Sequence, residues 1–431
     1  MNGPENSTGE KPPAVTGSYA VLRNRDFRLY LIGRLIFNFG QQMLVMAIGW
    51  ELYERTHSAM ALLMVGLMQV IPMVLLTLPA GHLADNYDRK KIILFTSLFV
   101  LGSTLGLTLA SAWHASVYWT YVCLLVMGAA RTFMLAAGAA FLPQLVARKD
   151  LSQAVNWNAS TFQISSIIGP VLAGALIDLA KRDNAALVYG ANVLATLAFC
   201  VLISLVRQQR VVAVREKMTF KGLLTGFNFV FANKIILGII TLDMLAVLLG
   251  GAVMLLPIYA KDILFIGPTG LGLLKAALPV GAVVCTFVLA HRPPLQNAGR
   301  ALLWAVTIFG LATIGFGFSS WFWLSFLMLF ICGASDNVSV VVRHTLVQLL
   351  TPDDKRGRVS AVNNLFIGTS NELGDVESCG VAQLLGPTIG NTLATGAMIS
   401  AVTGGVGTIL VVLAVALIWP EIRKYGRLDA H

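Results

Sequence analysis

Long apolar stretches alternate with short polar segments along almost the whole chain. Each stretch is roughly 20–30 residues long, which is what a helix needs to cross the hydrocarbon core of a bilayer. The polar interruptions are too short to form separate domains. The pattern predicts twelve transmembrane helices, over Phe27–Trp50, Ser58–Ala80, Ile92–Ala112, Val117–Leu142, Leu151–Leu179, Ala186–Val206, Ile235–Tyr259, Gly270–Ala290, Ala301–Phe318, Trp321–Leu349, Val359–Leu385 and Thr395–Trp419.

The composition indicates a membrane protein rather than a soluble one. Of the 431 residues, 56% are hydrophobic and only 12% are charged, whereas soluble domains have about 25% charged residues. We therefore predict an all-α membrane protein with two six-helix bundles, at 21–206 and 222–420, joined by a basic cytoplasmic linker at 207–221. The tail at 1–20 is predicted to be disordered, since it lacks the apolar core of a signal peptide. A second cytoplasmic tail covers 421–431.

Basic residues are unevenly shared between the segments that join the spans. If both termini are cytoplasmic, 22 of the 31 Lys and Arg residues lie in cytoplasmic segments and four lie in the opposite ones. Positive charge on cytoplasmic loops orients membrane proteins, so the bias predicts cytoplasmic termini and an even number of crossings. It also accounts for the formal net charge of +10 without a nucleic-acid partner.

The two halves of the chain repeat a short pattern. Gln144–Val146 leads through a charged turn to Ala154–Asn156, and Gln348–Leu350 leads through another to Ala361–Asn363. Related halves that enclose a central site are the common plan of secondary transporters. The repeat therefore predicts a transporter with its site between the two bundles.

Other classes of protein have less support. The five cysteines stand singly in apolar stretches, so they form neither a metal-ligand pattern nor a disulfide framework. The sequence has no phosphate loop G-x-x-x-x-G-K-[ST], which argues against a nucleotide-driven pump. We expect no enzymatic activity, no metal and no cofactor. A membrane receptor without transport activity is the alternative from another class, although it would usually carry a larger soluble segment.

The segment between the second and third spans has the most distinctive residues. Gly81, Asp85, Arg89, Lys90 and Lys91 are expected to form a short turn, with Gly81 ending the second helix. The segment resembles the signature loop of the major facilitator superfamily, G-x-L-A-D-x-x-x-R-K/R-K/R. The resemblance implies a latch, in which these charges hold the two bundles together on the cytoplasmic side in one conformation and separate in the other. The alternative is an ordinary basic turn.

A glycine–proline motif lies in the fifth span. Gly169, Pro170 and Gly174 combine a helix kink with small residues that let helices approach closely. The motif resembles the G-P-x-x-G-G pattern of exporters in the superfamily, with Ala173 in place of one glycine. The resemblance favours export, and an ordinary packing kink is the alternative.

Polar residues in the first and fourth spans are candidates for a central cavity. Arg131 resembles a superfamily motif for proton coupling, and a charge at this depth is expected to face a cavity or a partner. A purely structural arginine is the alternative. Arg34 is expected to line the same cavity, with Asn38, Gln41 and Gln42 on one helix face.

Acidic residues are found in spans of the second half. Asp243, Asp336, Glu372 and Asp375 are candidates for proton or substrate exchange, because burial favours the neutral form of a carboxyl group. Glu372 and Asp375 are three residues apart and share a helix face. We expect at least one of Asp243, Glu372 and Asp375 to be essential. The alternative is that these acids pair with Lys275, Arg343 or His344 and only fix the bundle. Glu377 is a further acid of the eleventh span.

Longer stretches resemble one branch of the superfamily, which includes bacterial siderophore exporters and macrolide efflux proteins. They are Phe141–Val146, Leu242–Ala252, Leu255–Ala260, Leu350–Asp354 and Arg356–Val359.

The resemblance to this branch implies a proton-driven antiporter of a bacterial inner membrane. We expect it to act as a monomer that exports a small amphipathic molecule by alternating access. A siderophore is the first choice of substrate and a macrolide-like or other drug the second. A proton-linked importer is the alternative within transport.

Overall fold

The computed structural model describes residues 19–180, 185–207, 227–292, 297–352, 355–390, 392–424 and 426. The tail predicted at 1–20, the linker predicted at 207–221 and the tail predicted at 421–431 lie wholly or mostly outside these residues. Within them the chain is helical and contains no strand.

The first half forms six long helices. Their ends are fixed locally, since Asn24 caps α1 through the amides of Asp26 and Phe27, and Asp88 caps α3 through those of Lys90 and Lys91. The helices are α1 (Arg25–Thr56), α2 (Ala59–Asn86), α3 (Arg89–Ala112), α4 (Val117–Leu145), α5 (Leu151–Ala180) and α6 (Ala186–Leu205), with short 3-10 turns η1 (Ala20–Arg23) and η2 (Arg148–Asp150).

The second half repeats this plan with one interrupted span. Its elements are α8 (Lys234–Gly250), η3 (Val253–Leu255), α9 (Leu256–Ile258), η4 (Tyr259–Ile263), α10 (Gly267–Ala290), α11 (Ala298–Gly317), α12 (Phe322–Leu350), α13 (Arg356–Leu385), η5 (Gly386–Gly390), α14 (Leu393–Ile418) and α15 (Pro420–Lys424). Residues 227–232 are also helical.

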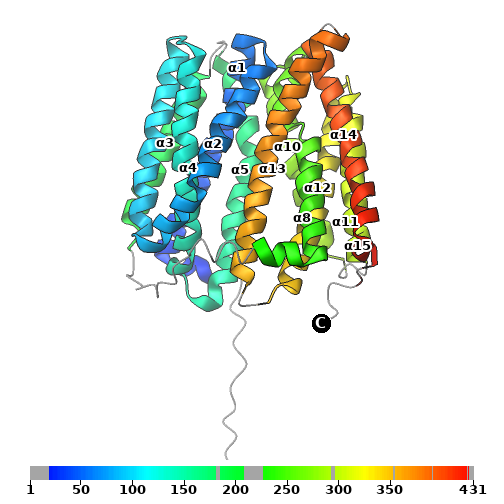
Figure 1. Ribbon diagram of the computed structural model, residues 1–431. Coiled ribbons are helices and arrows are strands. Elements are labelled where there is room, and N and C mark those ends of the chain that lie inside the picture. The colour runs from blue at the N-terminus through cyan, green and yellow to red at the C-terminus, as the bar shows by residue number, and fades with distance from the viewer. Residues whose placement is uncertain are drawn as a thin grey trace, which may run out of the picture.

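Eleven of these helical segments are long and apolar enough to cross a membrane. The twelfth, α13, is as long as the others and lies among them (Figure 1). It is less apolar because it carries Glu372, Asp375 and Glu377. The prediction of an all-α membrane protein with twelve long helices is confirmed.

The seventh span is not one helix over Ile235–Tyr259, as the apolar pattern predicted. The α-helix ends at Gly250, and Gly251 precedes a 3-10 turn, a short α-turn and the π-helix η4. A break inside a membrane frees backbone groups that need partners. The freed carbonyl of Gly251 accepts a hydrogen bond from the Ser378 hydroxyl of α13. The break is therefore stabilised by another helix, a contact that hydropathy does not reveal.

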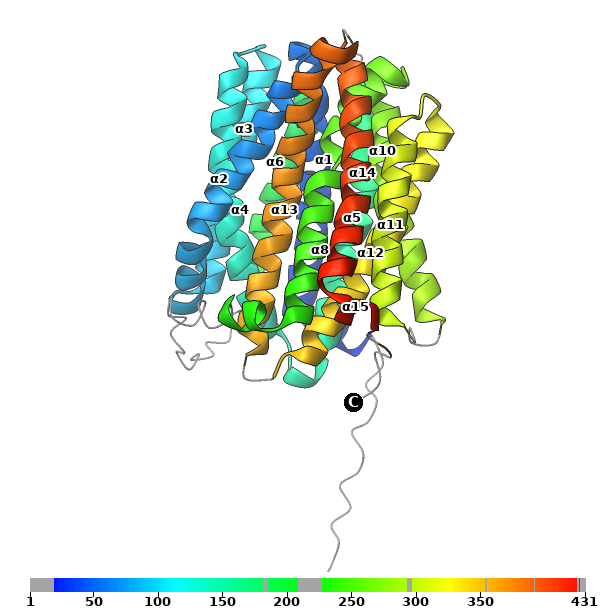
Figure 2. The same cartoon turned by 45° about the vertical axis from the view of Figure 1, so that its right-hand side comes forward.

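The long helices run side by side in two groups, α1–α6 and α8–α14 (Figures 1 and 2). η1 and α15 lie at the same end of the molecule, which we call the terminal face, and the other end is the distal face. The groups meet mainly where α5 packs on α10 and α2 packs on α13.

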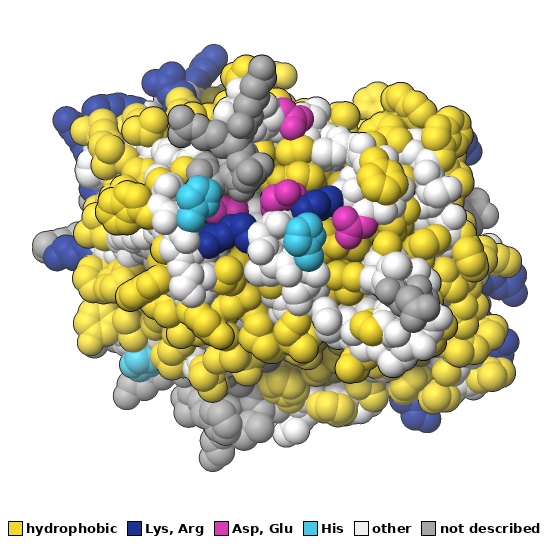
Figure 3. Space-filling model, turned by 90° about the horizontal axis from the view of Figure 1, so that it is seen from above, with side chains coloured by type: hydrophobic (Ala, Val, Ile, Leu, Met, Phe, Trp, Pro, Cys, Tyr) yellow, Lys and Arg dark blue, Asp and Glu magenta, His cyan; other side chains and the backbone are white. Residues whose placement is uncertain are grey.

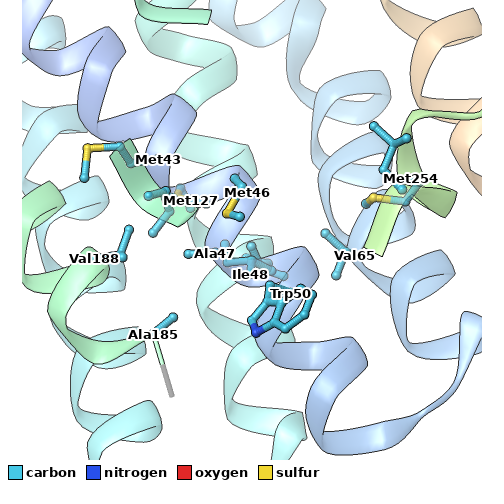
Figure 4. Packing of buried hydrophobic residues seen from close by; sticks show 14 of the residues in the cluster. Met43, Met46, Ala47, Ile48, Trp50, Val65, Met127, Ala185, Val188 and Met254 are labelled. Carbon is cyan, nitrogen blue, oxygen red and sulfur yellow. The ribbon is translucent and has the colours of Figure 1, made fainter. Parts of the chain in front are cut away.

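The distal half of α1 is the most deeply buried part of the first group. Met46, Ala47 and Ile48 lie among side chains of neighbouring helices, and Met254 of η3 reaches the same cluster from the second group (Figure 4). Apolar contact thus joins the two groups near the distal face.

Candidate functional site

Polar side chains join the two bundles at the distal face. The Lys261 ammonium lies 2.7 Å from the Glu54 carboxylate, and the neighbouring Tyr53 hydroxyl donates to Asp262. These contacts hold the end of α1 against η4. Figure 3 looks down on this face and shows acidic and basic side chains gathered near its centre.

Two further contacts at the distal face join other helix pairs. The Asp178 carboxylate of α5 accepts hydrogen bonds from the hydroxyl and the amide of Thr269 in α10. The Gln383 side-chain oxygen of α13 accepts from the Met60 amide of α2 at 3.2 Å. We call the whole set the distal gate: Tyr53, Glu54, Met60, Asp178, Lys261, Asp262, Thr269 and Gln383.

The predicted glycine–proline motif lies at the interface between the bundles. A Cβ atom on Gly174 would stand 2.4 Å from the backbone oxygen of Pro268, and one on Gly272 would stand 2.3 Å from that of Pro170. A Cβ on Gly169 would stand 2.6 Å from Gln42. The glycines therefore let the backbones of α5 and α10 touch, whereas the sequence predicted a kink without naming a partner helix.

The signature segment differs in structure from the predicted turn. α2 continues to Asn86, so Gly81 does not end it, and a Cβ on Gly81 would meet nothing within 4 Å. The turn itself is only Tyr87 and Asp88, because the Asp88 side chain starts α3 at once.

The basic residues of this segment contact their own bundle. The Arg89 guanidinium donates to the Asp85 carbonyl oxygen at 2.9 Å, and Lys90 donates to the carbonyl oxygens of Ser204 and Val206 at 2.8 and 2.7 Å. Among the described residues, Asp85 and Lys91 form no ion pair with the second bundle. The latch, which concerns another conformation, stays a prediction.

Four charged residues between the bundles are linked by electrostatic interactions, although none of them forms a salt bridge within the described part of the chain. Glu372 of α13 interacts electrostatically with Arg131 of α4, and Asp375 interacts with both Glu372 and Lys275 of α10. The Met254 amide also donates a hydrogen bond to the Asp375 carboxylate. We call Arg131, Lys275, Glu372 and Asp375 the central cluster. Arg131 is exposed and reaches Gln69 of α2 at 3.4 Å.

Lys275 was predicted only as a counter-charge, and the structure gives it an equal place in the cluster. A basic residue inside a span is the one signal that the sequence offers for it. Its position beside Asp375 depends on how α10 packs near α13, which a periodic pattern does not specify.

The other two candidate acids lie elsewhere, within the second bundle. Asp243 forms an ion pair with Arg343, and both residues are buried. Asp243 therefore matches the alternative in which an acid of a span pairs with a basic residue and fixes the bundle. Asp336 lines a small pocket between α8, α11 and α12.

The polar residues of α1 contact different helices of the first bundle, and the cavity predicted beside them stays a prediction. The Asn38 amide donates to the Thr161 hydroxyl of α5 at 3.2 Å, whereas the Gln41 amide donates to Asn192 of α6 at 3.4 Å. Arg34 is half-buried, and its Nε atom has no hydrogen-bond partner in the described part of the chain. Asn38 and Gln41 thus join helices of the first bundle. The described residues contain no group of three or more His, Cys, Asp or Glu side chains that could hold a metal ion.

Comparison with known proteins identifies the family to which this chain belongs. The model of the family described as "Transmembrane secretion effector" matches residues 16–416. The chain is 27% identical over 410 residues to the enterobactin exporter EntS of Citrobacter koseri, with 93% of each chain covered. It is 26% identical over 404 residues to the enterobactin exporter EntS of an Escherichia coli strain, again with 93% of each chain covered.

Solved transporter structures share the fold. A bacterial homologue of the human lysosomal transporter Spinster, in an inward-facing and unoccupied conformation, matches with a TM-score of 0.70 at 13% identity, covering 93% of this chain and 97% of that one. The nucleoside transporter NupG matches with a TM-score of 0.70 at 13% identity, covering 93% and 99%. The protein is thus a multi-pass membrane transporter of small molecules and not an enzyme. The chain belongs to the transmembrane secretion effector family within the major facilitator superfamily.

Proposed function

We propose that this chain is a proton-driven exporter of a small amphipathic molecule, a siderophore before other classes. The observation that carries the proposal is the central cluster, which brings two carboxyl groups and two basic side chains together between bundles that polar contacts join at one face. The similarity to proteins named enterobactin exporters supports a siderophore as the substrate.

The polar contacts support alternating access. The distal gate is formed, while the hydrogen bonds of Arg89 and Lys90 near the terminal face stay within their own bundle in the part of the chain that the structure describes. With cytoplasmic termini in a bacterial inner membrane, this arrangement corresponds to an inward-facing state. Export then requires the gate to separate and the latch to form.

The central cluster supplies a means of proton coupling. Glu372 and Asp375 repel each other when both are ionised, so protonation of one relieves the repulsion. Ionised Glu372 can accept a hydrogen bond from a hydroxyl group of the substrate, and a proton on Glu372 weakens that bond. Substrate and proton thus compete within one cluster, as antiport requires.

The test is substrate flux into inside-out vesicles under an imposed pH gradient, with catecholate siderophores, macrolides and cationic dyes as the panel. We expect gradient-dependent uptake of a siderophore, lost in Glu372→Gln or Asp375→Asn. Glu377→Gln is the matched control, since Glu377 belongs to the same helix but not to the central cluster. Uptake that ignores the gradient would refute proton coupling. Uptake of dyes or macrolides alone would replace the siderophore.

A further inference from the structure

A second polar site lies inside the second bundle, apart from the central cluster. It is a small pocket with room for about one water-sized species. Asp243, Ser335, Asp336 and Ser339 contribute its polar lining, and apolar side chains such as Phe309 close the remainder. No residue of α13 lines it, so Glu372 and Asp375 belong to a different site.

The charges around this pocket do not balance. Asp243 is neutralised by Arg343. Asp336 has no Lys, Arg or His nitrogen within ion-pair distance among the described residues. A carboxylate in an apolar setting is costly unless it is neutralised. Asp336 therefore needs a bound cation or a proton to be neutral.

The hydroxyl groups of the pocket have lone pairs that are free to accept. Ser335 already donates within α12, to the carbonyl oxygen of Ile331 at 2.7 Å, which leaves its lone pairs free. Ser339 is only 3% exposed, and its oxygen has no hydrogen-bond partner. It lies three residues after Asp336, on the same helix face. The unpartnered oxygen of Ser339 and the unpaired carboxylate of Asp336 are both suited to bind an electropositive ligand.

We propose that this pocket binds one sodium ion through Asp336, Ser335 and Ser339. Oxygen ligands suit a hard cation. A single unbalanced negative charge fits a monovalent ion better than Mg²⁺ or Ca²⁺, and the size of the pocket fits an ion that has lost its water shell. The ion would hold α12 against α8 and α11. Sodium binding does not depend on the proposed export function.

The experiment is equilibrium binding of radioactive sodium to the purified full-length protein, in choline buffer from mildly acidic to mildly alkaline. We expect saturable binding of one ion per chain. Asp336→Asn should abolish binding, and Ser339→Ala should weaken it by at least about tenfold, since even the loss of a group outside the ligand set typically weakens metal binding by about 10- to 100-fold. Monodisperse elution in gel filtration shows that each variant is folded.

Two controls locate the site. Ser325→Ala removes another buried hydroxyl of α12, one that donates to Ser319 at 2.8 Å outside the pocket, and should leave binding unchanged. Asp375→Asn changes the central cluster and should also bind sodium normally, so failure of export and failure of this proposal are distinguishable. Absence of sodium binding at every pH would overturn the proposal, and Asp336 would then be neutralised by a proton. Normal binding by Asp336→Asn would equally overturn it.

Discussion

Gly272→Ala tests whether backbone contact between α5 and α10 is needed to close the distal face. The added Cβ would stand 2.3 Å from the Pro170 oxygen, 2.9 Å from its carbonyl carbon and 3.0 Å from the Val171 Cα. Ordinary contact begins near 3.4 Å, so the two backbones must separate by about 1 Å. All three atoms belong to a helix backbone, which has no rotamer with which to move aside.

Overpacking of this kind typically costs about 1–3 kcal/mol. The cost falls on the distally closed state, in which α5 and α10 touch. The ratio of open to closed molecules should therefore rise by about 5- to 150-fold. A transporter held open at the distal face would exchange states less often, so turnover should fall as well.

The measurement is the distance between spin labels placed on the two bundles at the distal face, at Tyr118 and Trp321, which are 78% and 64% exposed. The native cysteines are first replaced. We expect a longer distance population in Gly272→Ala. Gly102→Ala is the matched control, because a Cβ there meets nothing within 4 Å. A wild-type distance distribution and normal turnover in Gly272→Ala would refute the reasoning.

Three other substitutions test separate contacts. Lys261→Gln should favour the open distal face by no more than about 1 kcal/mol, because the pair with Glu54 is partly exposed, and the exchange of both charges should restore the spin-label distances. Arg343→Met should lower stability by about 3–5 kcal/mol by leaving Asp243 buried without its partner, with much of the loss recovered by adding Asp243→Asn; thermal unfolding in detergent measures both, and an unchanged midpoint would contradict the pairing. Asp85→Asn should insert normally and lose most transport in the vesicle assay, and near-normal flux would remove the latch.

Helix positions were largely predictable from hydropathy, because crossing a bilayer demands a fixed length of apolar chain. The structure places α5 at Leu151–Ala180, one residue longer than predicted. The same reasoning missed the break after Gly250, since an interrupted span is as apolar as a continuous one. The hydrogen bond from Ser378 to the Gly251 carbonyl helps to stabilise the break.

Site residues were less predictable, because their partners come from distant parts of the chain. Asn38 and Gln41 are close on a helical wheel, yet in a packed bundle that small angular difference points them to α5 and α6. The sequence singled out Asp243 and Glu372 because each is an acid inside an apolar span. It did not distinguish the buried pair with Arg343 from the central cluster with Arg131, since that depends on which helices meet.

The break in the seventh span also links the middle of the membrane to the distal face. Met254 donates its backbone N–H to Asp375, and Lys261 and Asp262 of the distal gate follow within the same short segment. A straight helix would have used that N–H internally. Met254 and Asp262 are eight positions apart along the chain, so we expect a change of charge on Asp375 to act on the main chain that carries the gate.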